Sequence, residues 1–135
     1  MAITIKLTIT LLLLLLPLQA FFQTCHGESA GIAVYWGQDG GEGNLTEACT
    51  SGLYSYVIIG FISEYGGHQP PSVNLAGHCS PSINDCKFIG PEITECQSLC
   101  IKVLISIGGP FGGIQFLTDP DDAIYLADYI YNNFL

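Results

Sequence analysis

The stretch that decides the fold is Ile101–Gly109, IKVLISIGG, a short run of Ile, Val and Leu that stops at a pair of glycines. Both of its alternating faces are apolar, which is typical of a strand buried on both sides. A buried helix segment is the alternative, but a short, β-branched run ended by glycine favours a strand. A strand covered on both faces predicts a parallel sheet with helices packed outside it. Ser106, Gly108 and Gly109 then lie at its carboxyl end, where α/β folds place their chemistry.

Charge is unevenly distributed in this chain of 135 residues, which has three basic residues against twelve Asp and Glu. The net charge of −9 argues against nucleic acid and anionic membrane surfaces as partners. It fits an acidic protein whose ligand is neutral or cationic. The length is sufficient for one small domain.

Residues 1–30 have the pattern of a secretory signal peptide. Lys6 precedes an unbroken Leu11–Leu16 run, and Pro17 and Ala20 follow that run. The apolar run is too short to predict a membrane span. We place the cleavage site between residues 20 and 30 and the mature domain at residues 31–135.

Secretion takes a chain through an oxidising compartment, so the six cysteines are interpreted first as disulfide partners. Removal of Cys25 with the leader leaves an odd number, and one thiol then has no partner within the chain. The six are Cys25, Cys49, Cys79, Cys86, Cys96 and Cys100.

The mature chain begins with a strand–helix–strand pattern. Ile32–Gly37 is the first predicted strand, and the glycine-rich segment 37–43, GQDGGEG, cannot continue it. Asn44 begins a short helix as its N-cap, with Glu47 as the capping-box partner. Tyr56–Phe61 is the second predicted strand, so this part reads as a βαβ unit with a right-handed crossover.

A long irregular loop is predicted over residues 63–90, where proline and glycine recur. Pro91 is a suitable first helical residue, and Glu92–Cys100 is the second predicted helix. Asp119 caps a third helix. The apolar stripe predicted for that helix consists of Ile124, Ala127, Ile130 and Phe134.

Three strands therefore alternate with three helices. Three parallel strands form a poor independent sheet because both edges stay open. The residue pattern alone indicates a secreted α/β fragment, the opening part of something larger.

Four segments carry a more specific signal: GIAVYWGQ at 31–38, YSYVIIGF at 54–61, VNLAGHC at 73–79 and IKVLISIGG at 101–109. In this order they resemble the plant class III acidic endochitinases of glycoside hydrolase family 18. The resemblance covers nearly all of residues 31–135, and ADYIYNNFL at 127–135 resembles the family's third helix.

The resemblance implies a (β/α)8 TIM barrel, of which this chain would supply the first three or so β/α units. Such barrels take roughly 250 residues and place the active site at the carboxyl ends of the strands. Residues 31–135 are the N-terminal part of such a domain and cannot close eight strands.

The family's catalytic signature, D-x-x-D-x-D-x-E, follows the fourth strand, and the pattern does not occur in this sequence. In the family the glutamate protonates the leaving oxygen, and the substrate's own N-acetyl carbonyl attacks the anomeric carbon. A positioned general acid contributes roughly 10²–10⁴-fold to the rate. We therefore expect the chain alone not to hydrolyse chitin.

The resemblance also implies roles for residues of this chain. Tyr35 and Phe61 match aromatic positions that line the floor beneath the sugar. Gln38 and Asn74 match polar positions that border the sugar subsites. Gly109 matches the glycine pair beside the groove.

Two disulfides of the family match Cys49 with Cys96 and Cys79 with Cys86. Cys100 stands where the family is expected to have another residue, and we interpret it as a buried thiol without a partner. Pro110 replaces a third glycine of the family, removes a backbone donor and stiffens the rim.

Other ligands were weighed against these interpretations. Segment 37–43 mimics a phosphate cradle, but Asp39 and Glu42 would repel phosphate and no Lys or Arg is near, so a rim loop is favoured. Metal ligands can be drawn from His78, Cys79 and Cys86, or from Cys96 and Cys100, but secretion favours disulfides. Neither a metal nor another cofactor is expected.

Several residues receive plainer interpretations. Trp36 points away from Tyr35 and is expected to pack against outer helices. Glu64 is interpreted as a solvated loop residue, and His68 and His78 as ordinary loop residues. An acidic group caps the third helix and complements its dipole. Its members are Asp119, Asp121 and Asp122.

Asn44–Thr46 is an N-glycosylation sequon, Asn-Leu-Thr, and Asn44 is its acceptor. The same asparagine is the proposed helix cap, so a glycan would alter the cap.

Three hypotheses follow. The first is the N-terminal part of a secreted, extracellular or vacuolar chitinase-like monomer, whose partner is chitin or a related N-acetylglucosamine oligosaccharide when the barrel is complete. The second is a non-enzymatic relative, either a xylanase inhibitor or a lectin-like protein. The third is a non-functional remnant, which a cooperative unfolding transition and chitin binding would contradict.

Overall fold

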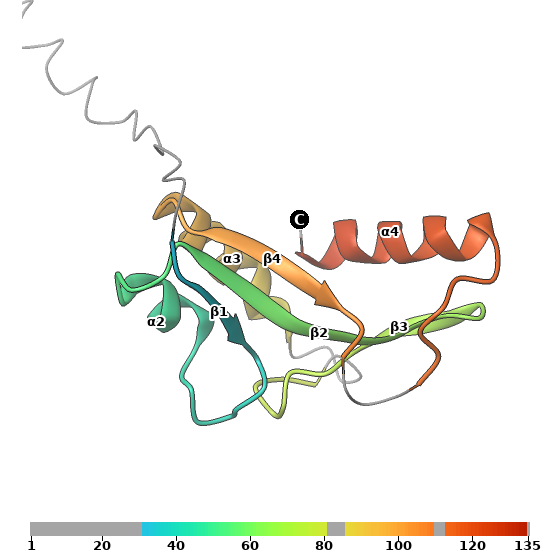
Figure 1. The fold of residues 1–135 in the computed structure, drawn as a ribbon, viewed down its shortest axis with the longest axis horizontal. Coiled ribbons are helices and arrows are strands. Elements are labelled where there is room, and N and C mark those ends of the chain that lie inside the picture. The colour runs from blue at the N-terminus through green and yellow to red at the C-terminus, as the bar shows by residue number, and fades with distance from the viewer. Residues whose placement is uncertain (1–30, 81–85, 110–112, 135) are drawn as a thin grey trace, which may run out of the picture.

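The computed structural model describes residues 31–80, 86–109 and 113–134 (Figure 1). The predicted leader with Cys25, and Pro110, lie outside these described residues. The strands are β1 (Ala33–Trp36), β2 (Tyr56–Gly66), β3 (Gln69–Val73) and β4 (Lys102–Ile107). The helices are α2 (Leu45–Thr50), the 3₁₀ turn η2 (Cys86–Phe88), α3 (Ile89–Ser98) and α4 (Pro120–Phe134).

Strand β2 is the centre of the sheet. It pairs in parallel with β1 on one side and with β4 on the other. Its second half pairs with β3 in antiparallel orientation. Figure 1 shows β2 running beyond β1 and β4 to meet β3.

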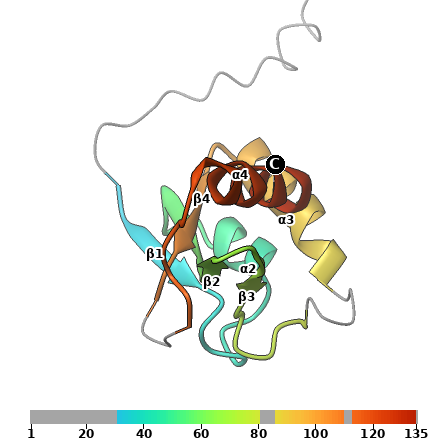
Figure 2. The ribbon, with the colours of Figure 1, turned by 90° about the vertical axis from the view of Figure 1, so that its right-hand side faces the viewer.

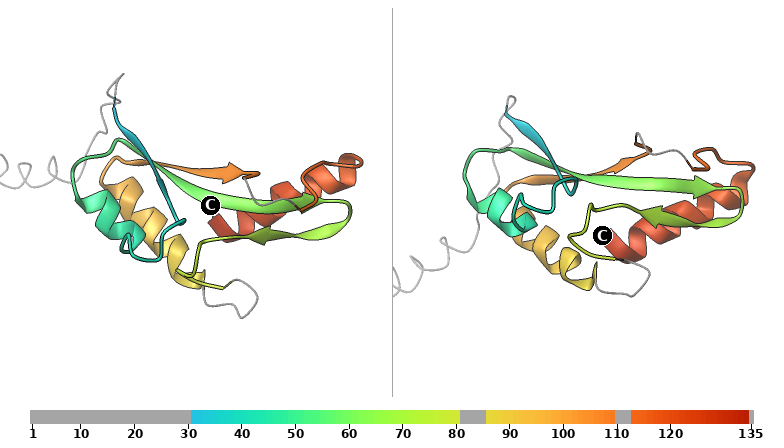
Figure 3. Two further views of the ribbon diagram at one scale, coloured as in Figure 1. Left: turned by 60° about the horizontal axis from the view of Figure 1, so that its bottom comes forward. Right: turned by 90° about the horizontal axis from the view of Figure 1, so that it is seen from below.

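The parallel register aligns residues of the three strands in rows across the sheet. Trp36 pairs with Ile59, which pairs with Ile105. We name these three residues the covered row. They face the helices, and Trp36 and Ile59 are 2% and 1% exposed. Figure 3 shows α2 and α3 lying along one face of the sheet.

The hydrophobic core lies between this face and the helices. Leu45 of α2 and Ile89 and Ile93 of α3 pack against the sheet residues. Phe134 at the end of α4 packs against the same cluster. The views in Figures 2 and 3 show α4 running beside the sheet next to α3. The core is therefore one-sided.

The prediction that Ile101–Gly109 is covered on both faces is wrong for the described residues. Tyr35 pairs with Ile58, which pairs with Leu104, and we name these three residues the bare row. Tyr35 is 54% exposed and Leu104 is 50% exposed. The strand itself is confirmed, because Lys102–Ile107 pairs with β2 in parallel.

The predicted irregular loop over residues 63–90 is also partly wrong. β2 does not stop at Phe61 but continues to Gly66 and turns back into β3. Gly66 and Gly67 both have positive φ, at 89° and 61°, which supplies the turn. Glu64 accordingly lies on a strand, with an exposed side chain, and not in a loop.

The helix boundaries differ where proline was taken as a start signal. The predicted helix Glu92–Cys100 begins at Ile89 and ends at Ser98. Pro91 lies inside its first turn, where the missing N–H has no helical partner in any case. The predicted cap of α2 is confirmed, since Asn44 and Glu47 form the capping box.

The stripe predicted for α4 is wrong at two of its four positions. Ile124 is 59% exposed and Ala127 is exposed, whereas Asp122 is 2% exposed and Leu126 is 8% exposed. Positions 122 and 126 are one helical turn apart, so they share a face. The attachment of Asp122 to the β2–β3 turn fixes the rotation of α4, as described below.

Among the helices of the described residues, none has both the length and the apolar character that crossing a membrane requires.

Candidate functional site

The carboxyl ends of the parallel strands bring two aromatic side chains together. The rings of Tyr35 from β1 and Phe61 from β2 have centroids 5.8 Å apart and planes inclined by 34°. Tyr35 is more than half exposed and Phe61 is partly buried. A tilted pair at this distance is a favourable aromatic arrangement. The pair presents an apolar surface on the bare side of the sheet.

Gly109, which follows β4, packs against this pair. Its φ is +125°, a conformation that favours glycine. A Cβ placed there would lie 3.2 Å from Cγ of Phe61. The preceding residue, Gly108, donates its N–H to the Ile62 carbonyl over 2.8 Å. Glycine therefore lets the chain pass close to the Phe61 ring.

Gln38 joins three segments that meet at this end of the sheet. Its Nε2 lies 2.9, 2.7 and 3.0 Å from the carbonyl oxygens of Gly37, Gly60 and Asn74. An amide nitrogen has two hydrogens, so at most two of these bonds are fully formed at once. Among the described residues nothing donates to its Oε1. That oxygen can accept a hydrogen bond from a ligand.

Asn74 connects the segment after β3 to the aromatic pair. Its backbone N–H and C=O both pair with Phe61, over 2.9 and 2.8 Å. Its side-chain Oδ1 accepts from the N–H of Ala76 over 3.0 Å. The structure thus brings Tyr35, Gln38, Phe61, Asn74 and Gly109 to one end of the sheet. Among the described residues, the side-chain hydrogen bonds of Gln38 and Asn74 all go to backbone atoms.

The glycine-rich loop 37–43 is organised by a carboxylate, as expected for a rim loop and not for a phosphate cradle. Oε1 of Glu42 accepts from the N–H groups of Gly37 and Asp39 over 2.6 and 3.2 Å. Nε2 of His78 lies 3.1 Å from the same oxygen. The His78 ring also lies on Trp36, with centroids 4.4 Å apart.

His78 is therefore not the ordinary loop residue that the sequence suggested. Its side chain is 9% exposed and closes the rim loop against the core. No local signal reveals this, because His78 and Glu42 are 36 residues apart in the sequence.

A second polar cluster joins the β2–β3 turn to α4. Asp122 accepts hydrogen bonds from the N–H groups of Gly67 and His68, over 2.9 and 2.8 Å. It also accepts from the N–H and the hydroxyl of Thr118. The Thr118 hydroxyl first, and then these N–H groups, hold the pKa of Asp122 far below its usual value, against the opposing effect of burial.

The acidic residues at the start of α4 thus have different roles. Oδ1 of Asp119 accepts from the N–H groups of Asp121 and Asp122, both over 3.0 Å, which is the predicted cap. His68 lies between two carboxylates, with Nε2 3.1 Å from Asp119 and Nδ1 3.5 Å from Asp122. Because the oxygens of Asp122 already accept four hydrogen bonds, the cluster is an anchor and offers few lone pairs to a metal ion.

The structure contains both disulfides that the family resemblance implies. Cys49 of α2 is bonded to Cys96 of α3, and Cys79 is bonded to Cys86. The interpretation of Cys100 as an unpaired thiol is wrong, because Cys100 is also disulfide-bonded. Cys79, Cys86, Cys96 and Cys100 are all in disulfides, so none of them is a thiolate that could bind a metal ion.

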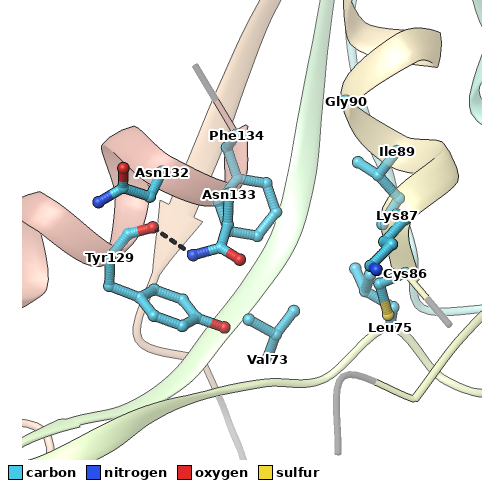
Figure 4. Close-up of a pocket in the computed structure, with 10 residues that line it drawn as sticks. All are labelled: Val73, Leu75, Cys86, Lys87, Ile89, Gly90, Tyr129, Asn132, Asn133 and Phe134. Atoms are coloured by element: carbon cyan, nitrogen blue, oxygen red, sulfur yellow. Dashed lines mark hydrogen bonds between the residues drawn. The ribbon is translucent and has the colours of Figure 1, made fainter. Parts of the chain in front are cut away.

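A cavity of about 470 Å³ lies between β3, the start of α3 and the end of α4 (Figure 4). Its apolar wall includes Val73, Leu75 and Ile89, and Tyr129 and Phe134 line it from α4. Figure 4 also shows Nδ2 of Asn133 donating to the Tyr129 carbonyl, over 2.7 Å. No residue of this cavity belongs to the predicted sugar site.

Comparisons with curated proteins and with solved structures both find chitinases. No family model matches the chain. An acidic endochitinase from Phaseolus angularis is 52% identical over 124 residues, which cover 90% of this chain and 41% of that protein. A crystal structure of a chitinase from Ipomoea carnea has a TM-score of 0.72 and 46% identity over 78% of this chain and 39% of its own.

The same structural likeness extends to proteins with other names. The xylanase and α-amylase inhibitor protein from Scadoxus multiflorus has a TM-score of 0.66 and 46% identity, over 80% of this chain and 37% of its own. The chain spans about two fifths of the length of the curated relatives that it matches. Over that span the chain is similar in sequence and in fold to plant endochitinases.

Proposed function

We propose that this chain contributes one side of the sugar-binding groove of a secreted plant chitinase that cleaves β-1,4 bonds between N-acetylglucosamine units. The observation that carries the proposal is the Tyr35–Phe61 pair, which lies where the parallel segments of β1 and β2 end, with Tyr35 54% exposed. This is where α/β barrels hold their substrates. Identity to named endochitinases over most of the chain supports the same substrate class.

The chemistry of the pair suits a neutral sugar polymer. One face of a pyranose ring presents C–H groups, which pack on aromatic faces, while its hydroxyl and acetamido groups need hydrogen-bond partners. The accessible Oε1 of Gln38 can accept from such a group. A net charge of −9 leaves no electrostatic preference for an anionic polymer.

The exposed apolar side chains of the bare row support the proposal that a larger barrel surrounds this groove. Tyr35, Ile58 and Leu104 present apolar side chains on one face, and β1 and β4 each leave one edge without a strand in the described residues. In a closed barrel this face is the interior and both edges are paired. The general acid of the substrate-assisted reaction would then come from the part of the relatives that this chain does not span.

A graft tests the proposal. Residues 31–134 replace the matching segment of the Phaseolus angularis endochitinase, and hydrolysis of a chitin oligosaccharide is measured. We expect an active graft, with kcat/KM reduced about three- to tenfold by Tyr35→Ala or Phe61→Ala, because an aromatic contact contributes roughly 1 kcal/mol. Tyr125→Ala, an exposed aromatic residue of α4, is the matched control. Equal activity in all three variants would contradict the assignment of the pair.

A second candidate function is inhibition of another glycosidase. It rests on the likeness to the xylanase and α-amylase inhibitor protein, whose identity to this chain equals that of the chitinase structure. The curated relatives at 47–52% identity are named endochitinases, which favours the enzyme. The measurement that separates the two is the rate of a xylanase and of an α-amylase with and without the chain. Inhibition at micromolar concentration would favour the second candidate.

A further inference from the structure

We propose that Asn44 carries an N-linked glycan attached to Nδ2, and that the folded domain keeps the helix cap intact beneath it. The inference rests on the secretory route that the proposed function includes, and not on sugar binding by the groove. Its starting point is the Asn-Leu-Thr sequon at 44–46, whose central residue is not proline.

The folded structure separates the two polar atoms of the Asn44 side chain. Oδ1 accepts from the N–H of Glu47 over 2.7 Å and so caps α2. Nδ2 makes no hydrogen bond to any described residue, and the side chain is exposed. An N-linked sugar replaces one hydrogen of Nδ2 and leaves Oδ1 as an acceptor. A glycan on Nδ2 is therefore compatible with the helix cap, contrary to the expectation from the sequence.

The reciprocal half of the capping box is also left intact. Oε2 of Glu47 accepts from the backbone N–H of Asn44 over 3.0 Å, which does not involve the Asn44 side chain. Asn44 has extended backbone angles of −82° and 167°. The side chain at such an Ncap position stands at the end of the helix and not against its flank.

The other two sequon residues show when the modification must occur. Leu45 is fully buried in the core, and the Thr46 hydroxyl donates to Glu95 of α3 over 3.1 Å. The Cys49–Cys96 disulfide fixes α2 against α3 a few residues further on. The complete triad is therefore accessible to a transferase only before α2 docks, while Nδ2 alone stays accessible afterwards.

The covalent step is a glycosyl transfer from a lipid-linked oligosaccharide diphosphate. Nδ2 attacks C1 of the terminal N-acetylglucosamine, the C1–O bond to the diphosphate breaks, and the lipid diphosphate leaves with the electron pair. Nδ2 loses one proton, and neither partner is oxidised or reduced. The acceptor lies just after the rim loop 37–43, so the glycan stands at the same end of the sheet as Tyr35 and Phe61.

The test is expression of the full chain with its own leader in plant cells, followed by intact-mass analysis before and after enzymatic release of N-glycans. We expect one releasable glycan on the wild type and on Thr46→Ser, which keeps the sequon. Asn44→Asp keeps a capping oxygen but removes the acceptor nitrogen, so it should lose the glycan completely and keep the thermal midpoint of the unmodified chain.

A matched positive control uses the same triad elsewhere. Phe116→Asn creates Asn-Leu-Thr at 116–118, at a position that is 61% exposed. A glycan on this variant's new sequon with none on Asn44 would overturn the proposal. If neither the wild type nor the Phe116→Asn chain carries a glycan, the premise that the chain is secreted is wrong and the proposal fails. Neither result depends on chitin binding, so the proposed groove is judged separately.

Discussion

The two faces of the central sheet differ in cover, although the covered row and the bare row both consist of apolar residues. The covered row, Trp36, Ile59 and Ile105, packs under α2 and α3. The bare row lies one residue earlier on each strand, and its Tyr35 and Leu104 are about half exposed. A strand alternates its side chains between faces, so neighbouring residues of one strand experience different environments. Apolar character alone does not determine which face is buried.

We expect this contrast to separate the residues that stabilise the fold from those that contact a ligand. The covered row is part of the hydrophobic core. The bare row and the Tyr35–Phe61 pair leave apolar surface exposed, which a ligand or another part of a protein can cover. An exposed apolar patch of this kind marks an interaction site or a ligand groove. Each prediction below tests one part of that separation.

The largest effect compares two adjacent residues of β1. Trp36→Ala removes a side chain that is 2% exposed and should cost roughly 3–5 kcal/mol of unfolding free energy. Tyr35→Ala, at 54% exposure, should change it by only about 0.5 kcal/mol. Denaturant unfolding of the oxidised chain, followed by circular dichroism, measures both. Similar losses for the two variants would break the two-face comparison.

The next effect concerns the disulfide that holds the covering helices together. The Cys49–Cys96 bond closes a loop with a sequence separation of 47, and the Cys79–Cys86 bond one with a separation of 7. Loop-closure entropy predicts stabilisation of roughly 4 and 2 kcal/mol respectively. Replacing each pair by alanine and comparing denaturant midpoints tests the order. A reversed order would show that native strain or residual structure outweighs chain entropy.

A smaller effect is expected at Gly109. Gly109→Ala imposes a side chain at φ +125° and brings Cβ to 3.2 Å from the Phe61 ring, at a cost of roughly 1–3 kcal/mol. Gly52→Ala is the control, because Gly52 also has positive φ, +72°, but nothing within 4 Å of its Cβ. We expect only Gly109→Ala to change the near-ultraviolet circular dichroism of the aromatic pair. Identical spectra for both variants would contradict the contact.

The last effect depends on pH and concerns the β2–β3 turn, which belongs to neither row. The hydrogen bonds to Asp122 lower its folded pKa below the unfolded value of about 4. Its contribution is therefore complete above pH 4 and is lost as the pH falls toward the folded pKa.

The measurement is unfolding of the wild type and Asp122→Asn between pH 7 and pH 2. The advantage of the wild type should stay constant from pH 7 to about 5 and shrink below about pH 4. Asp121→Asn, in the exposed first turn, is the control. A constant advantage down to pH 2 would show that the carboxylate charge is not what anchors the turn.

Local patterns predicted the elements well where the signal lies within a few residues. The capping box of Asn44 and Glu47 and the Asp119 cap depend on neighbours three residues away or fewer, and both form. The parallel strands β1, β2 and β4 follow from short apolar runs ended by glycine. The β2–β3 hairpin was missed, because its prolines suggested a loop, although an edge strand tolerates proline.

The residues of the candidate site were predicted from long motifs, and the structure brings them to one end of the sheet. The partners of Glu42 and His78, and the anchor of Asp122, were not predicted. These contacts join segments from 36 to 55 residues apart, and no local pattern encodes such pairs.

The sequence by itself determined the acidic charge, the cysteine content, the helix caps and the parallel strands, because these depend on composition and on nearby residues. Only the tertiary structure decided which of two apolar faces α2 and α3 cover, how α4 is rotated, and that Cys100 is oxidised. The physical reason is that burial and pairing are set by which distant segments reach one another. These contacts depend on the packing of the whole chain and not on any one segment of it.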